Sequence, residues 1–84
     1  MKVDELNWID PNYEAYLQND PEKKLSIQYR STHRGALGRL QGQVDSSEIS
    51  VHFDEAQSAL SPGQAAVFYQ DDEVIGGGTI SSSF

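Results

Sequence analysis

Few residues in this sequence have the type and spacing that chemistry needs. His33 and His52 could bind a metal ion, but they stand 19 residues apart and the chain has no cysteine. A zinc site would need two carboxylates supplied by chance from elsewhere. Surface histidines are the simpler interpretation. The lack of cysteine also excludes disulfides, thiolate ligands and a cysteine nucleophile, and it favours a reducing, cytoplasmic location.

Two further runs look like ligand loops only in part. Asp71-Asp72-Glu73 lacks the spacing over about a dozen residues, with a central glycine, that calcium loops use, so it predicts a solvated hairpin turn. Gly76-Gly77-Gly78 lacks the Lys-Ser/Thr pair and the following helix of a phosphate-binding loop, so it predicts a bent strand. No serine stands in a nucleophile elbow. We therefore expect no catalytic residue, no metal and no cofactor in this chain.

The charges are segregated along the chain. The net charge is −7, yet residues 23–44 contain five bases and no acid. These bases are Lys23, Lys24, Arg30, Arg34 and Arg39. Such a block predicts one basic face, even though the overall charge opposes binding to nucleic acid. The alternative is that these cations pair with the acidic segments on either side.

Apolar residues alternate with polar ones along most of the chain, which predicts strands. The predicted strands are residues 6–9, 25–31, 36–44, 49–53, 65–69, and 74–75 continuing through the glycines to 79–80. Gly38 and Gly42 suggest a bulge or a strongly coiled strand. Short, evenly spaced strands without a long helical pattern predict an all-β fold, a small closed antiparallel barrel.

The first 22 residues depart from this pattern. Asp10 before Pro11 predicts an N-cap for one or two helical turns. Trp8 is large enough to plug one end of a barrel. Later in the chain, Pro62 and Gly63 suit the second and third positions of a turn whose third residue has a positive φ.

A chain of 84 residues allows a single domain. We place the barrel core at residues 5–80 and expect residues 81–84 to be a frayed tail. No apolar run approaches the roughly 20 residues of a membrane helix, so no membrane is expected as a partner. The residues predicted to be buried are Ile27, Val51, Phe53, Val67 and Ile80.

Several segments of the sequence resemble one enzyme family. Residues 60–69, Leu-Ser-Pro-Gly-Gln-Ala-Ala-Val-Phe-Tyr, followed by residues 76–80, Gly-Gly-Gly-Thr-Ile, closely resemble the C-terminal end of bacterial tRNA-specific 2-thiouridylases. Residues 6–9 resemble the start of the last domain of that family, and residues 27–30 resemble its Arg-Tyr-Arg strand. Residues 51–55 match the strand before the Pro-Gly-Gln turn, so the likeness runs in the family's order.

The resemblance implies a fragment of a transferase: a β-barrel like domain 2 of elongation factor Tu, beside an N-terminal catalytic domain. That enzyme converts the wobble uridine of tRNA to 2-thiouridine with ATP. The pyrophosphatase loop and the two catalytic cysteines of the family have no counterpart in this sequence, so the chain alone is expected not to be an enzyme. The implied partners are tRNA, the catalytic domain and a sulfur-relay protein.

In the family, the Arg-Tyr pair and the glutamine of Pro-Gly-Gln lie against tRNA, and these positions correspond to Gln28, Tyr29 and Gln64. Gln28 stands where the family has arginine, so a charged phosphate contact becomes a neutral one. Arg34 is a candidate to compensate for this loss. The predicted tRNA-binding residues are thus Gln28, Tyr29, Arg30, Arg34 and Gln64.

Alternatives remain open at this stage. Tyr29 could be a core residue with only its hydroxyl at the surface, and Gln64 could satisfy the backbone of its own turn. The whole barrel could serve as a protein-docking module, packing on the catalytic domain or on a sulfur donor without touching RNA. A small-ligand barrel is disfavoured, because so few short strands fill their interior with side chains.

Overall fold

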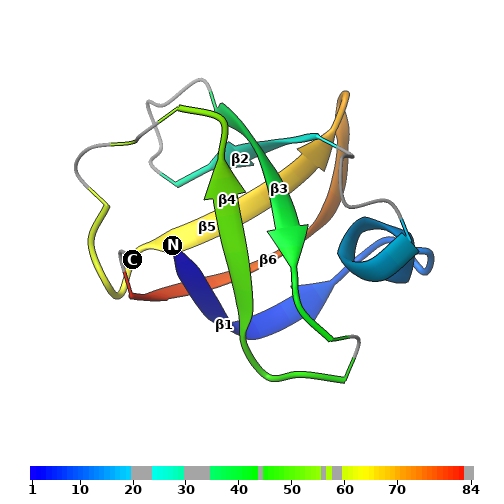
Figure 1. Cartoon of the computed structure of the whole chain (residues 1–84), viewed down its shortest axis with the longest axis horizontal. Helices are drawn as coiled ribbons and strands as arrows, with labels where there is room; N and C mark the ends of the chain where they lie inside the picture. The colour runs from blue at the N-terminus through cyan, green and yellow to red at the C-terminus, as the bar shows by residue number, and fades with distance from the viewer. Residues whose placement is uncertain (20–23, 30–34, 44, 56, 58–59, 83–84) are drawn as a thin grey trace.

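In a computed structural model of the chain, six antiparallel strands close into a barrel (Figure 1). The structure describes residues 1–19, 24–29, 35–43, 45–55, 57 and 60–82. The strands are β1 (Lys2–Trp8), β2 (Leu25–Gln28), β3 (Ala36–Gln41), β4 (Ile49–Phe53), β5 (Ala65–Gln70) and β6 (Glu73–Ser82). Around the barrel they follow the order β1-β4-β3-β2-β5-β6, and β6 pairs again with β1. The predicted all-β barrel is confirmed.

The first and the last strand of the chain are longer than predicted. β1 begins at Lys2 rather than at residue 6, and β6 runs unbroken through the three glycines to Ser82, two residues into the predicted tail. The hydroxyl of Ser81 donates a hydrogen bond of 2.8 Å to Oε2 of Glu48. β3 pairs with β2 and with β4 in regular register through Gly38, so the prediction of a bulge at that glycine was wrong. The register shifts lie instead on the two sides of β6.

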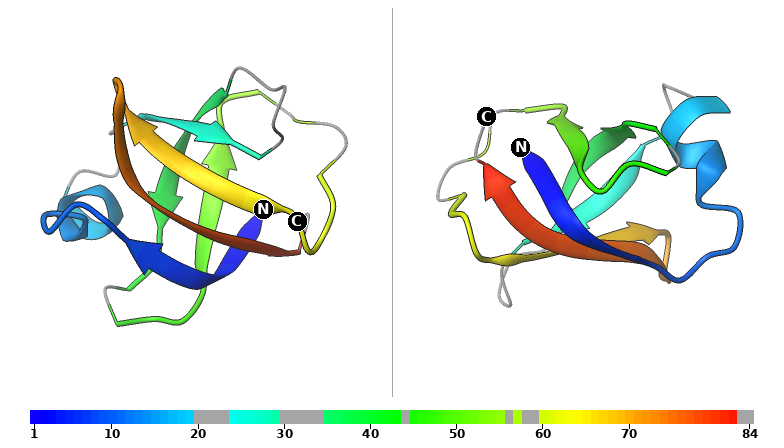
Figure 2. Two further views of the ribbon diagram at one scale, coloured as in Figure 1. Left: turned by 180° about the vertical axis from the view of Figure 1, so that it is seen from behind. Right: turned by 90° about the horizontal axis from the view of Figure 1, so that it is seen from below.

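A short helical segment closes the end of the barrel away from the two termini (Figure 2). It contains a single π-helical turn, η1 (Ala15–Asn19), which packs against β3. The predicted helix begins later than expected: Oδ1 of Asp10 accepts a hydrogen bond of 2.8 Å from the backbone N–H of Asn12, which holds a turn ahead of η1 and does not cap its first residue, Ala15. Within the described residues, no helix is long and apolar enough to cross a membrane.

Aromatic rings fill this same end of the barrel. The ring of Trp8 stacks on Tyr13 with centroids 4.6 Å apart. The centroid of the Phe68 ring lies 5.8 Å from that of Trp8, and the two ring planes are inclined by 37°. Phe68 itself is fully buried. Trp8 therefore links the interior of the barrel to the segment that precedes η1, as the sequence predicts.

The core contains three of the five residues predicted to be buried. Ile27, Val51 and Ile80 are at most 2% exposed, whereas Phe53 and Val67 are only half-buried. Phe53 is the last residue of β4, and its ring packs edge-to-face with Tyr29. Val67 was assigned to the wrong face: Phe68 points into the core, so Val67, its neighbour on the strand, points outward.

Candidate nucleic-acid interface

The structure brings Gln28, Tyr29 and Gln64 to one end of the barrel. Gln28, the last residue of β2, pairs with Val67 of β5, and Gln64 stands just before β5 begins. The separation along β5 between Val67 and Gln64 is about 10 Å for an extended chain. This is also the end where the two termini lie (Figure 2). The other two predicted contacts, Arg30 and Arg34, lie outside the described residues.

Tyr29 lies in the core, the second of the two roles that the sequence left open. It is 3% exposed, and its ring meets Phe53 edge-to-face with centroids 6.1 Å apart. Its hydroxyl donates a hydrogen bond of 3.1 Å to Oε1 of Gln57, whose amide nitrogen donates in turn to the carbonyl of Glu55. Tyr29 thus fixes the segment after β4 to the end of β2.

Gln64 helps to hold the turn that begins at Ser61. The backbone N–H of Ser61 donates to Oε1 of Gln64, and the N–H of Gln64 donates back to the carbonyl of Ser61, each at 3.2 Å. Gly63 has a φ of 95°, which confirms its predicted place as the third residue of this turn. Its N–H donates to the carbonyl of Ile80 at 2.8 Å, so the turn is fixed to β6.

Two cations of the basic block form a row with His52 across the outer wall of β2, β3 and β4. Arg39 and His52 pair directly on neighbouring strands, and both are exposed. Lys24 precedes Leu25, which pairs with Gly38, so Lys24 lies beside Arg39. We call Lys24, Arg39 and His52 the basic row. Lys23 lies outside the described residues.

The sequence did not single out this row, although a signal for it was present. Arg39 and His52 are 13 residues apart, but alternation turns both outward on their strands. A hairpin centred between residues 45 and 46 sets them opposite each other, as the observed register does. The alternative for the basic block also holds in one place, because Lys24 forms an ion pair with Asp54.

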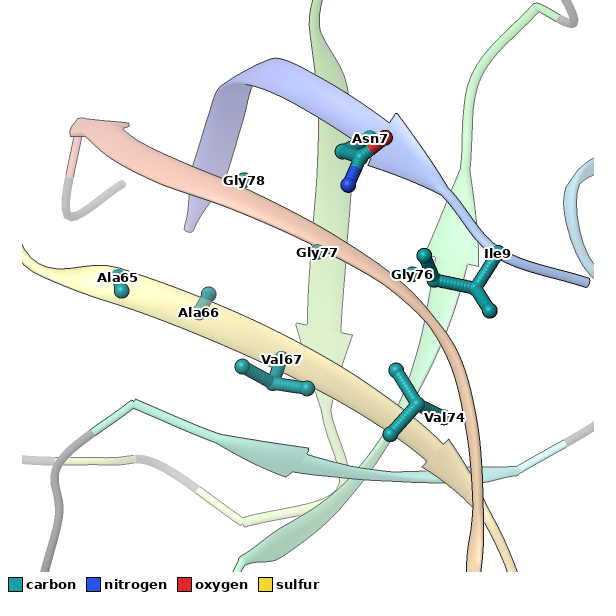
Figure 3. A pocket seen from close by; sticks show the side chains of 9 residues that line it. All are labelled: Asn7, Ile9, Ala65, Ala66, Val67, Val74, Gly76, Gly77 and Gly78. Carbon is teal, nitrogen blue, oxygen red and sulfur yellow. The ribbon is translucent and has the colours of Figure 1, made fainter.

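The opposite wall, formed by β5, β6 and β1, has a different character. A shallow groove of about 320 Å³ crosses it, and no charged residue lines it (Figure 3). We call it the glycine groove; its lining residues are Asn7, Ile9, Ala65, Ala66, Val67, Val74, Gly76, Gly77 and Gly78. Gln28 lies at its border, since it pairs with Val67 on the outer face of the sheet.

Charge and polarity are distributed unevenly over the described surface. The described residues contain no cluster of three or more His, Asp or Glu side chains that could hold a metal ion. The described surface has one wall with the basic row and Asp54, and on the opposite wall a groove lined by uncharged residues. Such a surface can select partners by charge and shape.

The sequence matches known proteins over nearly its whole length. Residues 1–80 match the family described as the aminomethyltransferase beta-barrel domain. The chain is 40% identical over 76 residues to the tRNA-specific 2-thiouridylase of Solibacter usitatus, a match that covers 90% of the chain and 20% of that protein. The corresponding protein of Heliobacterium modesticaldum is 42% identical over 78 residues, covering 93% of the chain and 19% of the relative. The chain thus spans about a fifth of the length of these relatives.

Proposed function

The chain belongs to the aminomethyltransferase beta-barrel domain family, in the form carried by tRNA-specific 2-thiouridylases, and we propose that it is the tRNA-contacting domain of such an enzyme. The relatives are named for an activity on tRNA, and this chain accounts for about a fifth of their length. In this proposal ATP and sulfur chemistry belong to the remainder of the enzyme, together with any sulfur-relay donor.

The observation that carries the proposal is the basic row. A protein of net charge −7 repels phosphate overall, so a cationic wall is needed for any productive approach to RNA. Arg39 projects from the middle of β3, and neither of its neighbours along the strand carries a charge. Lys24 and His52 flank it, and Asp54 is the acid that reduces the local charge.

We place the tRNA contact on this wall and on the adjoining end of the barrel. Gln28 and Gln64 would supply neutral hydrogen bonds there, and Arg30 and Arg34, which stand between β2 and β3 in the sequence, would add positive charge. Tyr29 would act indirectly, because its buried ring and its hydrogen bond to Gln57 support the segment after β4 rather than reach RNA.

The test is tRNA affinity of the full-length enzyme, measured at two salt concentrations. Arg39→Glu should weaken binding about tenfold and lower the magnitude of the salt slope by roughly 0.7, the value for one phosphate contact with a single strand. Arg30→Glu should act in the same direction. Both effects arise because the substitution replaces a cation, whose contact with phosphate releases counterions from the RNA, with an anion.

Glu48→Lys is the matched control, since it also reverses one charge on the surface, next to β4 rather than within the basic row. It should leave affinity unchanged or raise it slightly. If Arg39→Glu and Arg30→Glu both leave affinity and salt dependence unchanged, the basic row is only a solvated wall. Protein docking would then replace tRNA contact as the function of the barrel, a role that the uncharged glycine groove favours.

A further inference from the structure

The glycine groove exists because β6 approaches its neighbours too closely for side chains. A Cβ atom added to Gly77 would clash with the carbonyl oxygen of Ala66, and one added to Gly78 would point toward the interior and clash with the carbonyl oxygen of Asp4 and with the buried side chain of Val3. The floor of the groove is therefore bare backbone. Aliphatic side chains rise on its borders, with Ile9 and Val74 toward one end (Figure 3).

These aliphatic side chains remain open to solvent in the barrel. Ile9 is 59% exposed and Val74 is 39% exposed, and Val67 is half-buried between them and Gln28. Leu37 on β3 is also exposed, but it stands alone, whereas the groove gathers several aliphatic side chains, as is typical of an interaction site. The bare floor adds a concave shape into which a protruding side chain can fit.

We propose that the glycine groove docks an aliphatic segment flanked by lysine or arginine residues, located in the part of the 2-thiouridylase that this chain does not span. This rests on the proposed function, which makes the barrel one domain of a longer enzyme. The relatives have about four-fifths of their length outside the matched region, so a large protein surface is available to cover the groove.

Charge at the rim indicates the basic flanks. Asp10 follows Ile9 directly, and its backbone N–H bonds to the carbonyl of Ile75 beside Val74. Glu73 precedes Val74 in the strand, and Glu5 accepts a hydrogen bond of 3.0 Å from the hydroxyl of Thr79, next to Gly78. An uncharged floor inside an acidic rim favours a partner with an apolar centre and cationic edges.

The same rim disfavours the other occupants. A second copy of this chain would bring two acidic rims together, and each copy carries a net charge of −7. Phosphates of tRNA would meet carboxylates at the rim and no cation in the lining. A basic-flanked protein segment is the one partner that both the floor and the rim attract.

The test measures the reactivity of single cysteines in the full-length enzyme, because this chain has no cysteine of its own. Ile9→Cys and Val74→Cys report on the groove, and His52→Cys on the opposite wall is the matched control. Maleimide labelling of each barrel cysteine is followed by mass spectrometry of its peptide, in native and in denatured enzyme. The groove cysteines should react roughly tenfold more slowly than the control in the native enzyme only.

The acidic rim is tested by a second change in the Ile9→Cys enzyme. Glu73→Lys should raise the labelling rate about fivefold, because it places a cation against the cationic edges of the partner. Asp45→Lys, at an exposed acid in the turn between β3 and β4, should leave the rate unchanged. Equal labelling rates for Glu73→Lys and Asp45→Lys would overturn the proposal that the docked segment has basic flanks.

The remaining outcomes separate this inference from the proposed function. Labelling of the groove cysteines within about twofold of the control, without tRNA, would show an open groove and overturn the docking. Protection that appears only when tRNA is added would make the groove an RNA surface and would also overturn it. A protected groove together with unchanged tRNA affinity of Arg39→Glu would support the docking while the tRNA contact fails.

Discussion

The two walls of the barrel use their residues in opposite ways. On β2, β3 and β4, the strands pair in regular register, and the side chains of the basic row project from them into solvent. On β5, β6 and β1, the backbone itself forms the surface, because three glycines let the strands come close and the register shifts on both sides of β6. The contrast teaches that the basic row can change without affecting the fold, whereas Gly77 and Gly78 of the glycine groove cannot.

The largest expected difference is between two neighbouring residues of β5, one in the core and one in the glycine groove. Phe68 is fully buried against Trp8, so Phe68→Ala should destabilise the barrel by about 4 kcal/mol. Val67 points into the groove, so Val67→Ala should cost no more than about 1 kcal/mol. Urea denaturation of the 84-residue chain, followed by far-ultraviolet circular dichroism, measures both. Similar losses would mean that Val67 belongs to the core and not to the groove.

The next largest effect concerns the close approach of β5 and β6. Gly77→Ala places a methyl group against the carbonyl of Ala66, which is backbone and cannot rotate away, so we expect a loss of about 3 kcal/mol. Gly63→Ala is the matched control, because its methyl group meets open space and only its φ of 95° is strained. That strain should cost about 1 kcal/mol. If Gly77→Ala were the milder change, the groove would not depend on bare backbone.

The orientation of Val67 and Phe68 on β5 also shows how much of this fold the sequence can predict. The bounds of β4 follow from alternation, and the Pro62–Gly63 turn follows from the φ that proline and glycine allow. Residues 65–69 are all apolar or aromatic, so alternation gives no phase for this strand. Only the partner strands decide it: Val67 pairs with Gly77 and Gln28 on the outer face, and Phe68 takes the interior.

The candidate site was predictable to a smaller degree, for a related reason. The basic block was visible in the sequence, but its arrangement as a row depends on the register of β3 against β4. The roles of Tyr29 and Gln64 depend on partners far along the chain or across a turn, Gln57 and Ser61. Residue type alone could not choose between a surface contact and a structural bond.

Tyr29→Phe sharpens the comparison at the end of the barrel that adjoins the basic row. The change removes the hydrogen bond of the hydroxyl to Gln57 and keeps the ring against Phe53. We expect the free energy of unfolding to fall by about 1 kcal/mol. The tRNA affinity of the full-length enzyme should stay the same, because the side chain is almost inaccessible. Lower affinity at unchanged stability would instead make the hydroxyl a direct contact.

The smallest effect belongs to the ion pair of the basic row. Lys24 and Asp54 have side chains that are 45% and 37% exposed, so water and salt screen their attraction. A double-mutant cycle with Lys24→Ala and Asp54→Ala should give a coupling of about 0.5 kcal/mol, and about 1 M salt should reduce it toward zero. Urea denaturation of the four chains at low and high salt measures this coupling. A coupling of about 2 kcal/mol that survives high salt would mean that the row holds β2 to the segment after β4. The two walls would then differ only in how they stabilise the fold. A small, screened coupling leaves Lys24 free to exchange Asp54 for a phosphate at little cost, which the proposed tRNA contact requires.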